Sequence, residues 1–490
     1  MGERADRDRA TGLAAPELPA RQQRFPGSRR GLVLGLAVSS VLLGIFLTPS
    51  LSGTGQLQRA VWLGSSVVAM GFIVAVKRYQ RLPWLSAPMA YAAVFWLFHF
   101  GLVFPASLAP AVLDRYPAWM VEWLYYPETG KAAVLAAQFL GAFFVGWVLV
   151  SPTLPKARSI TGSPLEAAPE LVATGWLAIA GGGLLAATAV VRYGISVFGR
   201  SYEEFFPIHS PFSLALFVIA FGLVLHLAGG RSMRATALTG AWAYAPLALI
   251  TFLAGARTAP LVTGTVLAVA LGYRGYRASR IRLLVVLILI LSAIAVVQQT
   301  RGLGIQRIRE WPVSQATADP LSGIMELGGS LRPVSTTINY IDIGHGPFLH
   351  GSTYVYPVIR AAQRVLLLDR DTSENDPRLI ASYMAQLYGS AMGYSVVAEA
   401  YANGGAVGVV SFGLLWGLAL GLLAAGAHKP YGLAVLTAVL MPMILGIRNS
   451  FIFVPGWIVV GMALLIVGRL LLRPALTNGG RNPGPEAPAS

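Results

Sequence analysis

Eight arginines, two histidines and no lysine lie between Thr300 and Asn403, and long apolar runs precede and follow this segment. An arginine guanidinium group binds phosphate or pyrophosphate through two parallel hydrogen bonds, a geometry that the lysine ammonium group lacks. Solvent-exposed arginines that bind nothing are the alternative for any single position. As a set, however, these arginines favour a phosphorylated binding partner.

Five arginines of the chain are the candidates for binding a diphosphate: Arg257, Arg332, Arg360, Arg364 and Arg448. The first lies in a short turn between two apolar runs, the second follows a turn-prone segment, and the last occupies a break between the final two runs. The third and fourth are one helical turn apart and could clamp a phosphate between them. The alternatives are a helix-end cation reaching solvent for the first, and ion pairs of the third and fourth with Asp369 and Asp371.

Glu399 is the most specific carboxylate, because it lies among apolar residues just before an apolar run. A buried carboxylate needs a partner or a raised pKa. A general base or a ligand of the acceptor sugar is therefore one interpretation, and a structural pair with an arginine is the other. His350 is a second candidate base, with an incidental loop histidine as its alternative, and Asp342 and His345 are weaker candidates.

Three tyrosines, Tyr354, Tyr394 and Tyr401, could stack on sugar rings. Tyrosine presents a flat apolar face together with a hydroxyl group, which suits a carbohydrate. Tyrosines are equally common where a membrane meets water, so an interfacial aromatic belt explains them as well.

The motifs of common nucleotide-dependent enzymes, serine hydrolases and metal-dependent enzymes are missing from the sequence. It has no cysteine, and it contains neither a phosphate-binding glycine loop nor the G-x-S-x-G or H-E-x-x-H motif. The histidines in apolar runs lack metal-ligand spacing, so we expect no metal site and no cofactor. Arginine, carboxylate, tyrosine and histidine remain. Arginines can neutralise a departing diphosphate, and a carboxylate or histidine can take the proton of an attacking hydroxyl.

The composition identifies the chain as a membrane protein. Hydrophobic residues make up 55% of its 490 residues, charged residues only 12%, and the mean hydropathy is +0.63. No single soluble core could bury that much apolar surface. Most of the cations behind the net charge of +16 flank apolar runs, where they set membrane orientation, so we expect no nucleic-acid partner.

About twelve apolar runs can each cross a bilayer. They lie near residues 31–48, 58–76, 84–104, 132–150, 170–191, 211–229, 236–254, 258–273, 281–299, 405–426, 430–446 and 451–468. With both termini in the cytoplasm, the basic clusters between runs alternate as the positive-inside rule requires. The segments 105–131, 192–210 and 255–258 then lie on the outer face together with 300–404.

These patterns predict an all-α, polytopic transmembrane bundle of about twelve spans with a large ordered extracytoplasmic loop of short helices. Residues 1–30 form a disordered cytoplasmic tail, 31–299 form transmembrane helices 1–9, and 300–404 form the loop. Residues 405–468 form transmembrane helices 10–12, and 469–490 form a second cytoplasmic tail. Apolar and aromatic stretches within the loop favour short amphipathic helices that lie on the bundle or at the level of the lipid headgroups.

The sequence from Gly393 to Asn403, GYSVVAEAYAN, resembles the G-[FY]-S-x-[IV]-A-E-x-Y-x-N-[FY]-G pattern of O-antigen polysaccharide polymerases of the Wzy type. Gly351-Ser352-Thr353-Tyr354 with Pro357, and the turn 255–258, also resemble elements of that family. Gly404 replaces an aromatic residue usual in the family, which affects local packing. The resemblance covers about residues 250–450.

The resemblance implies a glycosyltransferase in the bacterial plasma membrane that joins undecaprenyl-diphosphate-linked repeat units at the outer face and releases undecaprenyl diphosphate, without metal or nucleotide. The lipid-linked glycans, membrane lipids, a flippase and a chain-length regulator are the partners that it implies. A ligase that transfers glycan to another acceptor is an alternative of the same class. A flippase or exporter of lipid-linked glycan is an alternative of a different class, and a non-catalytic assembly scaffold is a further one.

Overall fold

The computed structural model describes residues 55–116, 118–151, 168–199, 202–205, 209–300, 318–365, 376–387 and 393–472, together with a few isolated positions between 31 and 39. The predicted tail 1–30, residues 473–490 of the predicted tail 469–490, and most of the first apolar run lie outside the described residues, whereas residues 469–472 are helical. Four loop arginines also lie outside the described residues: Arg301, Arg307, Arg309 and Arg370. The described residues form helices and no strands.

The first half of the chain forms α2 (Gln56–Gln80), α3 (Ala87–Phe100), α4 (Val103–Leu108), η1 (Pro110–Arg115), α5 (Ala118–Val121), η2 (Glu122–Tyr125), α6 (Glu128–Val150), α7 (Pro169–Tyr193), η4 (Ile195–Gly199), α8 (Tyr202–Phe205), α9 (Ser210–Ala228), α10 (Met233–Ala243) and α11 (Ala245–Leu253). The second half forms α12 (Thr258–Tyr273), α13 (Arg280–Thr300), α15 (Pro320–Leu327), η7 (Gly328–Ser330), α16 (Leu331–Asp342), α17 (Ser352–Val365), α18 (Ile380–Leu387), α19 (Val396–Gly426), α20 (Pro430–Gly446), α21 (Phe453–Val467) and η8 (Gly468–Leu472).

Eleven of the twelve predicted apolar runs coincide with these helices, and the first lies mostly outside the described residues. Within the described residues, seven helices are long and apolar enough to cross a membrane, or eight if α10 and α11, bent by 43° at Tyr244, count as one span. Three further apolar helices, α3, α12 and α20, are shorter than 18 residues. The protein is therefore a multi-pass helical membrane protein, and the number of twelve spans stays a prediction.

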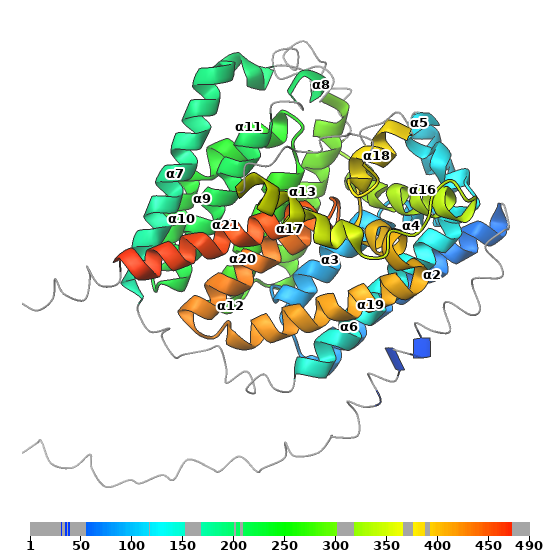
Figure 1. Cartoon of the computed structure of the whole chain (residues 1–490), viewed down its shortest axis with the longest axis horizontal. Helices are drawn as coiled ribbons and strands as arrows, with labels where there is room; N and C mark the ends of the chain where they lie inside the picture. Colours follow the sequence, from blue (N-terminus) through cyan, green and yellow to red (C-terminus); the bar gives the residue numbers. More distant parts are fainter. Residues whose placement is uncertain are drawn as a thin grey trace, which may run out of the picture.

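Close backbone contact joins α19 to α6, which run side by side in Figure 1. Gly413, Gly417 and Gly421 recur at every fourth position of α19 and therefore share one face. A methyl group at Gly413 would lie 2.6 Å from the carbonyl oxygen of Phe139, and one at Gly417 would overlap the carbonyl of Phe143. Small residues at this spacing bring helices together inside membranes, where no hydrophobic effect drives them.

Polar contacts define two ends of the bundle. At one end, the side chain of Gln58 at the start of α2 donates to the carbonyl oxygens of Leu124 and Tyr126, and Arg115 pairs with Asp319 at 3.7 Å. Helices α15 and α16 contact α4 and η2 of this end, and α17 contacts α19. Figure 1 shows α16 and α18 on the same side of the bundle as α4 and α5, and we call this end, with α15 to α18, the capped end. At the opposite end, Gln80 binds Trp147 and Ser151, and Tyr431 donates to Glu170 at 2.9 Å.

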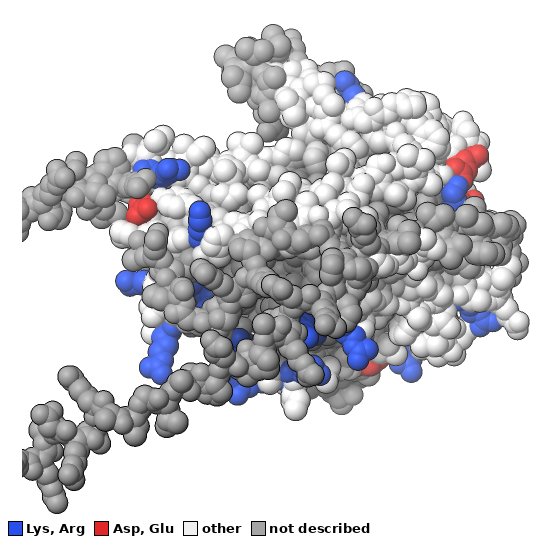
Figure 2. All heavy atoms as spheres, turned by 90° about the horizontal axis from the view of Figure 1, so that it is seen from below, with Lys and Arg blue, Asp and Glu red and all other residues white. Residues whose placement is uncertain are grey.

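Most described basic residues of the inter-helix turns lie at the opposite end: Lys77, Arg78, Arg81, Arg231, Arg234, Arg274, Arg277, Lys429 and Arg469. Figure 2 shows a face on which lysine and arginine outnumber aspartate and glutamate and on which wide areas carry neither. The positive-inside rule would put this opposite end in the cytoplasm, and the orientation stays a prediction.

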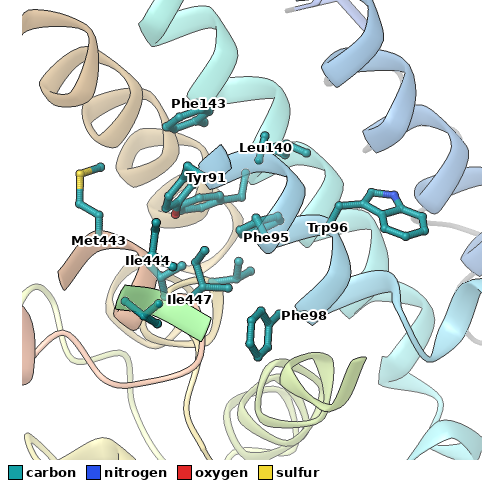
Figure 3. Close-up of a cluster of buried hydrophobic side chains, with 14 of the residues drawn as sticks. Tyr91, Phe95, Trp96, Phe98, Leu140, Phe143, Met443, Ile444 and Ile447 are labelled. Atoms are coloured by element: carbon teal, nitrogen blue, oxygen red, sulfur yellow. The ribbon is translucent and has the colours of Figure 1, made fainter. Parts of the chain in front are cut away.

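The core beside the capped end is aromatic. Tyr91 and Phe95 of α3 stack on Phe143 and Phe139 of α6 with ring centroids 4.8 and 5.2 Å apart. Figure 3 shows Ile444 and Ile447, from the end of α20, beside these α3 rings. Helix α3 is thus surrounded by packed apolar side chains, and its last turn provides a fixed support for the segments that meet there.

Candidate functional site

Two predicted arginines lie on separate segments of the chain that meet at the end of α3. The guanidinium carbon of Arg448, in the loop between α20 and α21, lies 5.6 Å from the centroid of the Phe98 ring. Gly328 of η7 packs directly on the backbone of Gly101 and Leu102, and Arg332 follows in the first turn of α16. We call this meeting point, from Phe98 to Leu102 with the segments packed on it, the α3 junction.

Arg257 reaches the same junction but has a carboxylate partner there. Its Nη2 atom lies 2.5 Å from Oε1 of Glu326, and the two side chains are only 6% and 3% exposed. Glu326 belongs to the last turn of α15, two residues before Gly328. Nη1 of Arg257 is buried without a hydrogen-bond partner among the described residues. The turn at 255–258 therefore supplies one partner of a buried ion pair. Removal of either partner would leave the charge of the other buried and uncompensated.

Gly393, the first residue of the motif, packs against Arg448. A Cβ atom at Gly393 would lie 2.9 Å from the Arg448 carbonyl oxygen and 3.2 Å from its Cγ atom. Both distances are shorter than ordinary van der Waals contact. Glycine is therefore required sterically at this position, because a side chain would displace Arg448.

Glu399 is 1% exposed and binds the loop that carries Arg448. Its Oε2 atom accepts the backbone N–H of Phe451 at 2.6 Å and the hydroxyl of Ser450 at 3.1 Å. One interpretation of the sequence paired Glu399 with an arginine. In the structure, Oε2 is bound by these two donors instead. Oε1 is buried, and no donor within the described part of the chain meets hydrogen-bond geometry with it, although the Thr353 hydroxyl lies close to the carboxylate. One carboxylate oxygen thus fixes the loop, and the other retains its capacity to accept a proton.

His99 supports the start of the Glu399 helix, a role that the sequence pattern did not predict. Nδ1 of His99 is 3.1 Å from the Phe95 carbonyl oxygen, so Nδ1 carries the proton. Nε2 then accepts the hydroxyl of Ser395 at 2.8 Å, and the same hydroxyl oxygen caps α19 by accepting the N–H of Val397. A polar residue in an apolar run was the available signal, but its partner lies 296 positions away.

Asn403 connects the Glu399 helix to the start of α17. Its Oδ1 atom accepts the N–H of Gly351 at 2.8 Å, and its Nδ2 group donates to the Thr353 hydroxyl at 2.7 Å and to the Glu399 carbonyl at 2.8 Å. His350 is exposed beside this connection in a left-handed turn with φ 47°. The candidate base His350 therefore lies on the same side of the Glu399 helix as the loop that carries Arg448.

After Asn403 the regular helix breaks. Gly404 and Gly405 have non-helical dihedral angles, and Gly405 has φ 61°. The motif therefore forms a short helix of its own, and the apolar part of α19 begins beyond the break. Left-handed φ values favour glycine because a Cβ atom clashes there.

The predicted sugar-binding tyrosines are largely buried. Tyr354 stacks on Phe412 with centroids 4.8 Å apart, and burial raises the pKa of its phenol. Tyr394 is enclosed as well, with its hydroxyl 2.9 Å from that of Thr337, and burial raises its pKa. The ring of Tyr401 is buried, but its hydroxyl joins a partly exposed polar group. Stacking on sugar rings stays a prediction for all three.

Arg360 and Arg364, the predicted phosphate clamp, belong to α17 at the capped end. The guanidinium carbon of Arg360 lies 5.8 Å from the centroid of the Tyr356 ring, and that of Arg378 lies 4.5 Å from it. Arg378 also pairs with Asp376 at 2.7 Å. The side chain of Arg364 and the residues Asp369 and Asp371 lie outside the described residues. A two-arginine clamp stays a prediction.

The fold and these residues define a class: a multi-pass helical membrane protein whose capped end brings arginines and a buried carboxylate together. The model of the family O-antigen polysaccharide polymerase Wzy matches residues 36–472, and the chain belongs to this family of polysaccharide polymerases. Comparisons with curated proteins and with solved structures yield no match. Lipid-linked glycans are the substrates that this family implies.

Proposed function

We propose that this protein joins undecaprenyl-diphosphate-linked oligosaccharide repeat units at the outer face of the bacterial plasma membrane. A hydroxyl of one unit attacks the anomeric carbon of the reducing-end sugar of the other. The bond between that carbon and the diphosphate oxygen breaks, and the lipid diphosphate leaves with the bonding electrons. Neither a nucleotide nor a metal ion takes part in this step.

The observation that carries the proposal is that Arg448 and the segment that carries Arg332 meet at the α3 junction, beside the buried Arg257–Glu326 pair. Two guanidinium groups from separate segments can bind both phosphates of the leaving group and neutralise the charge that develops on it. Glu326 neutralises Arg257, so this pair fixes the position of the neighbouring segments rather than adding net positive charge.

Glu399 is the general base in this proposal. Oε2 accepts hydrogen bonds from the Phe451 backbone N–H and the Ser450 hydroxyl, so the carboxylate has a fixed orientation. Oε1 has no hydrogen-bond partner among the described residues and can accept the proton of the attacking hydroxyl. His350, exposed on the neighbouring turn, is the second candidate for this role.

The test is reconstitution of the purified protein in vesicles with lipid-diphosphate repeat units of a single type. The expected product is a ladder of glycans, formed in the presence of a metal chelator and without added nucleotide. A requirement for a nucleotide sugar would overturn the proposed reaction. A single transfer to a different acceptor, with no ladder, would identify a ligase instead, because only a polymerase uses its own product as substrate.

A further inference from the structure

Three polar side chains form a closed network at the surface of the capped end. Nζ of Lys131, in the first turns of α6, lies 2.5 Å from Oδ2 of Asp342 at the end of α16. It also donates to the Tyr401 hydroxyl at 2.9 Å, and that hydroxyl donates to Oδ1 of Asp342 at 2.7 Å. Every pair in the network is therefore bonded, and the three groups hold one another in fixed positions.

The network is accessible to solvent. The side chains of Lys131 and Asp342 are 30% and 37% exposed, in contrast to the buried Arg257–Glu326 pair. A fixed carboxylate and a fixed ammonium group at the surface offer an acceptor and a donor at a short, defined spacing. Adjacent hydroxyls of a sugar present donors and acceptors at comparable spacing, so this pair suits a hydroxyl-rich ligand.

An aromatic ring borders the network. Phe348, 37% exposed, meets the Tyr401 ring edge to face with centroids 6.1 Å apart. The ring packs beside the helix break, since a Cβ atom at Gly405 would lie in ordinary van der Waals contact with it, at 3.4 Å. At Gly404 an added Cβ atom would have no neighbour within 4 Å, so the space beside the helix break is open. An exposed ring beside charged hydrogen-bonding groups matches the apolar face and polar edge of a sugar.

We propose that Lys131, Asp342 and Phe348 bind one sugar unit of the growing glycan away from the reacting bond. This inference rests on the proposed polymerase function. Tyr401 and Glu399 are two positions apart on one short helix, so their side chains point to nearly opposite faces. A ligand at the network is separated from Glu399 by about one helix diameter, on the order of 10 Å. Such a site retains the chain between additions, so it sets affinity and product length rather than the rate of the chemical step.

The competing explanation is a structural latch, because the same bonds connect α16 to α6 and α19. The amide of Asn339 also donates to Glu128 at 3.1 Å between the same helices. A latch depends on Lys131 and Asp342 but has no need of the exposed Phe348 ring. Phe348 therefore separates the two explanations.

The experiment measures binding of the oligosaccharide repeat unit, cleaved from its lipid diphosphate, to the full-length protein in nanodiscs. Asp342→Asn and Lys131→Met should each weaken binding by about tenfold, the effect of one lost charge-assisted hydrogen bond. Phe348→Ala should weaken it by about fivefold through loss of the ring contact, with an unchanged unfolding temperature. Tyr276→Ala, an exposed tyrosine at the opposite end, is the matched control and should bind as the unaltered protein does.

Product length is the second readout. If the sugar site exists, the three variants give shorter glycans from lipid-linked units while the rate of the first addition is preserved. If Phe348→Ala binds normally and the other two variants only lose stability, the network is a latch and the inference is wrong. If the unaltered protein makes a ladder but all variants bind and elongate normally, the sugar site is wrong and the polymerase stands. If the unaltered protein binds the oligosaccharide through these residues but makes no ladder, the sugar site stands and the polymerase fails.

Discussion

At the scale of single residues, the two carboxylate oxygens of Glu399 have different roles. Oε2 binds the 450–451 segment, while Oε1 has no hydrogen-bond partner among the described residues. A buried carboxylate with one free oxygen costs free energy, because water solvates both oxygens in the unfolded chain. Such a group is expected where function requires it.

Replacement of Glu399 by glutamine separates the two roles. The amide oxygen can still accept the Phe451 N–H, but the side chain no longer accepts a proton. We expect kcat for glycan extension to fall by about 100-fold or more, the usual contribution of a general base, with little change in unfolding temperature. His350→Ala should reduce kcat by less than about tenfold. The reverse order of effects in steady-state assays would assign the base to His350.

Arg332 and Arg448 are expected to act through guanidinium geometry as well as charge. Replacement of either by lysine keeps the charge and loses one of two parallel hydrogen bonds to phosphate. We expect kcat/KM to fall by about tenfold or more for each, from the loss of about 1.5–3 kcal/mol. Arg469→Lys, at the opposite end of the bundle, is the control. Equal activity of Arg448→Lys and this control would exclude Arg448 from the diphosphate site.

At the scale of elements, α19 combines a short motif helix with a long apolar helix. Ser395 and His99 fix its start, Asn403 fixes the end of the motif, and the glycine break separates the two parts. Beyond the break, the glycine face of α19 lies against the backbone of α6. The motif helix therefore gets its position from its neighbours, since eight residues are too few for a stable isolated helix.

Two glycines of α19 give a direct test of this packing. An alanine at Gly417 would overlap the Phe143 carbonyl, so Gly417→Ala should cost about 1–3 kcal/mol, as overpacking does. An added methyl group at Gly404 meets open space, and φ there is −161°, so Gly404→Ala should leave stability nearly unchanged. Thermal unfolding in one detergent compares the two. A tolerant Gly417→Ala would show that α6 and α19 are not in close contact.

At the scale of the whole molecule, the helix ends lie at the capped end or at the opposite end, which carries most basic residues of the inter-helix turns. The chain contains no cysteine, so single introduced cysteines report their side of the membrane without background. Tyr125 is 65% exposed at the capped end, and Tyr276 is 42% exposed at the other. We expect a membrane-impermeant thiol reagent to label Tyr125→Cys in intact cells, and Tyr276→Cys only after the membrane is opened. The opposite pattern would invert the orientation.

The sequence was sufficient to predict the all-α class and the positions of most apolar helices, because hydropathy dominates in a membrane chain. It also identified the family through the residues around Glu399. The sequence could not predict contacts between distant positions, because no local pattern pairs Arg257 with Glu326, His99 with Ser395 or Lys131 with Asp342. Burial of Tyr354 and Tyr394 was equally hidden, since a tyrosine in a core and one at an interface have the same local pattern.

The Arg257–Glu326 pair also constrains the order in which the protein is assembled. Synthesis reaches Arg257 first, and its partner follows 69 positions later, after α12 and α13 have been made. Until then the cation must remain at the aqueous surface, because burying an unpaired charge among apolar helices is costly. We therefore expect α12 to settle into its final depth only when α15 arrives, so that closure of the bundle around α3 is a late, post-insertion event.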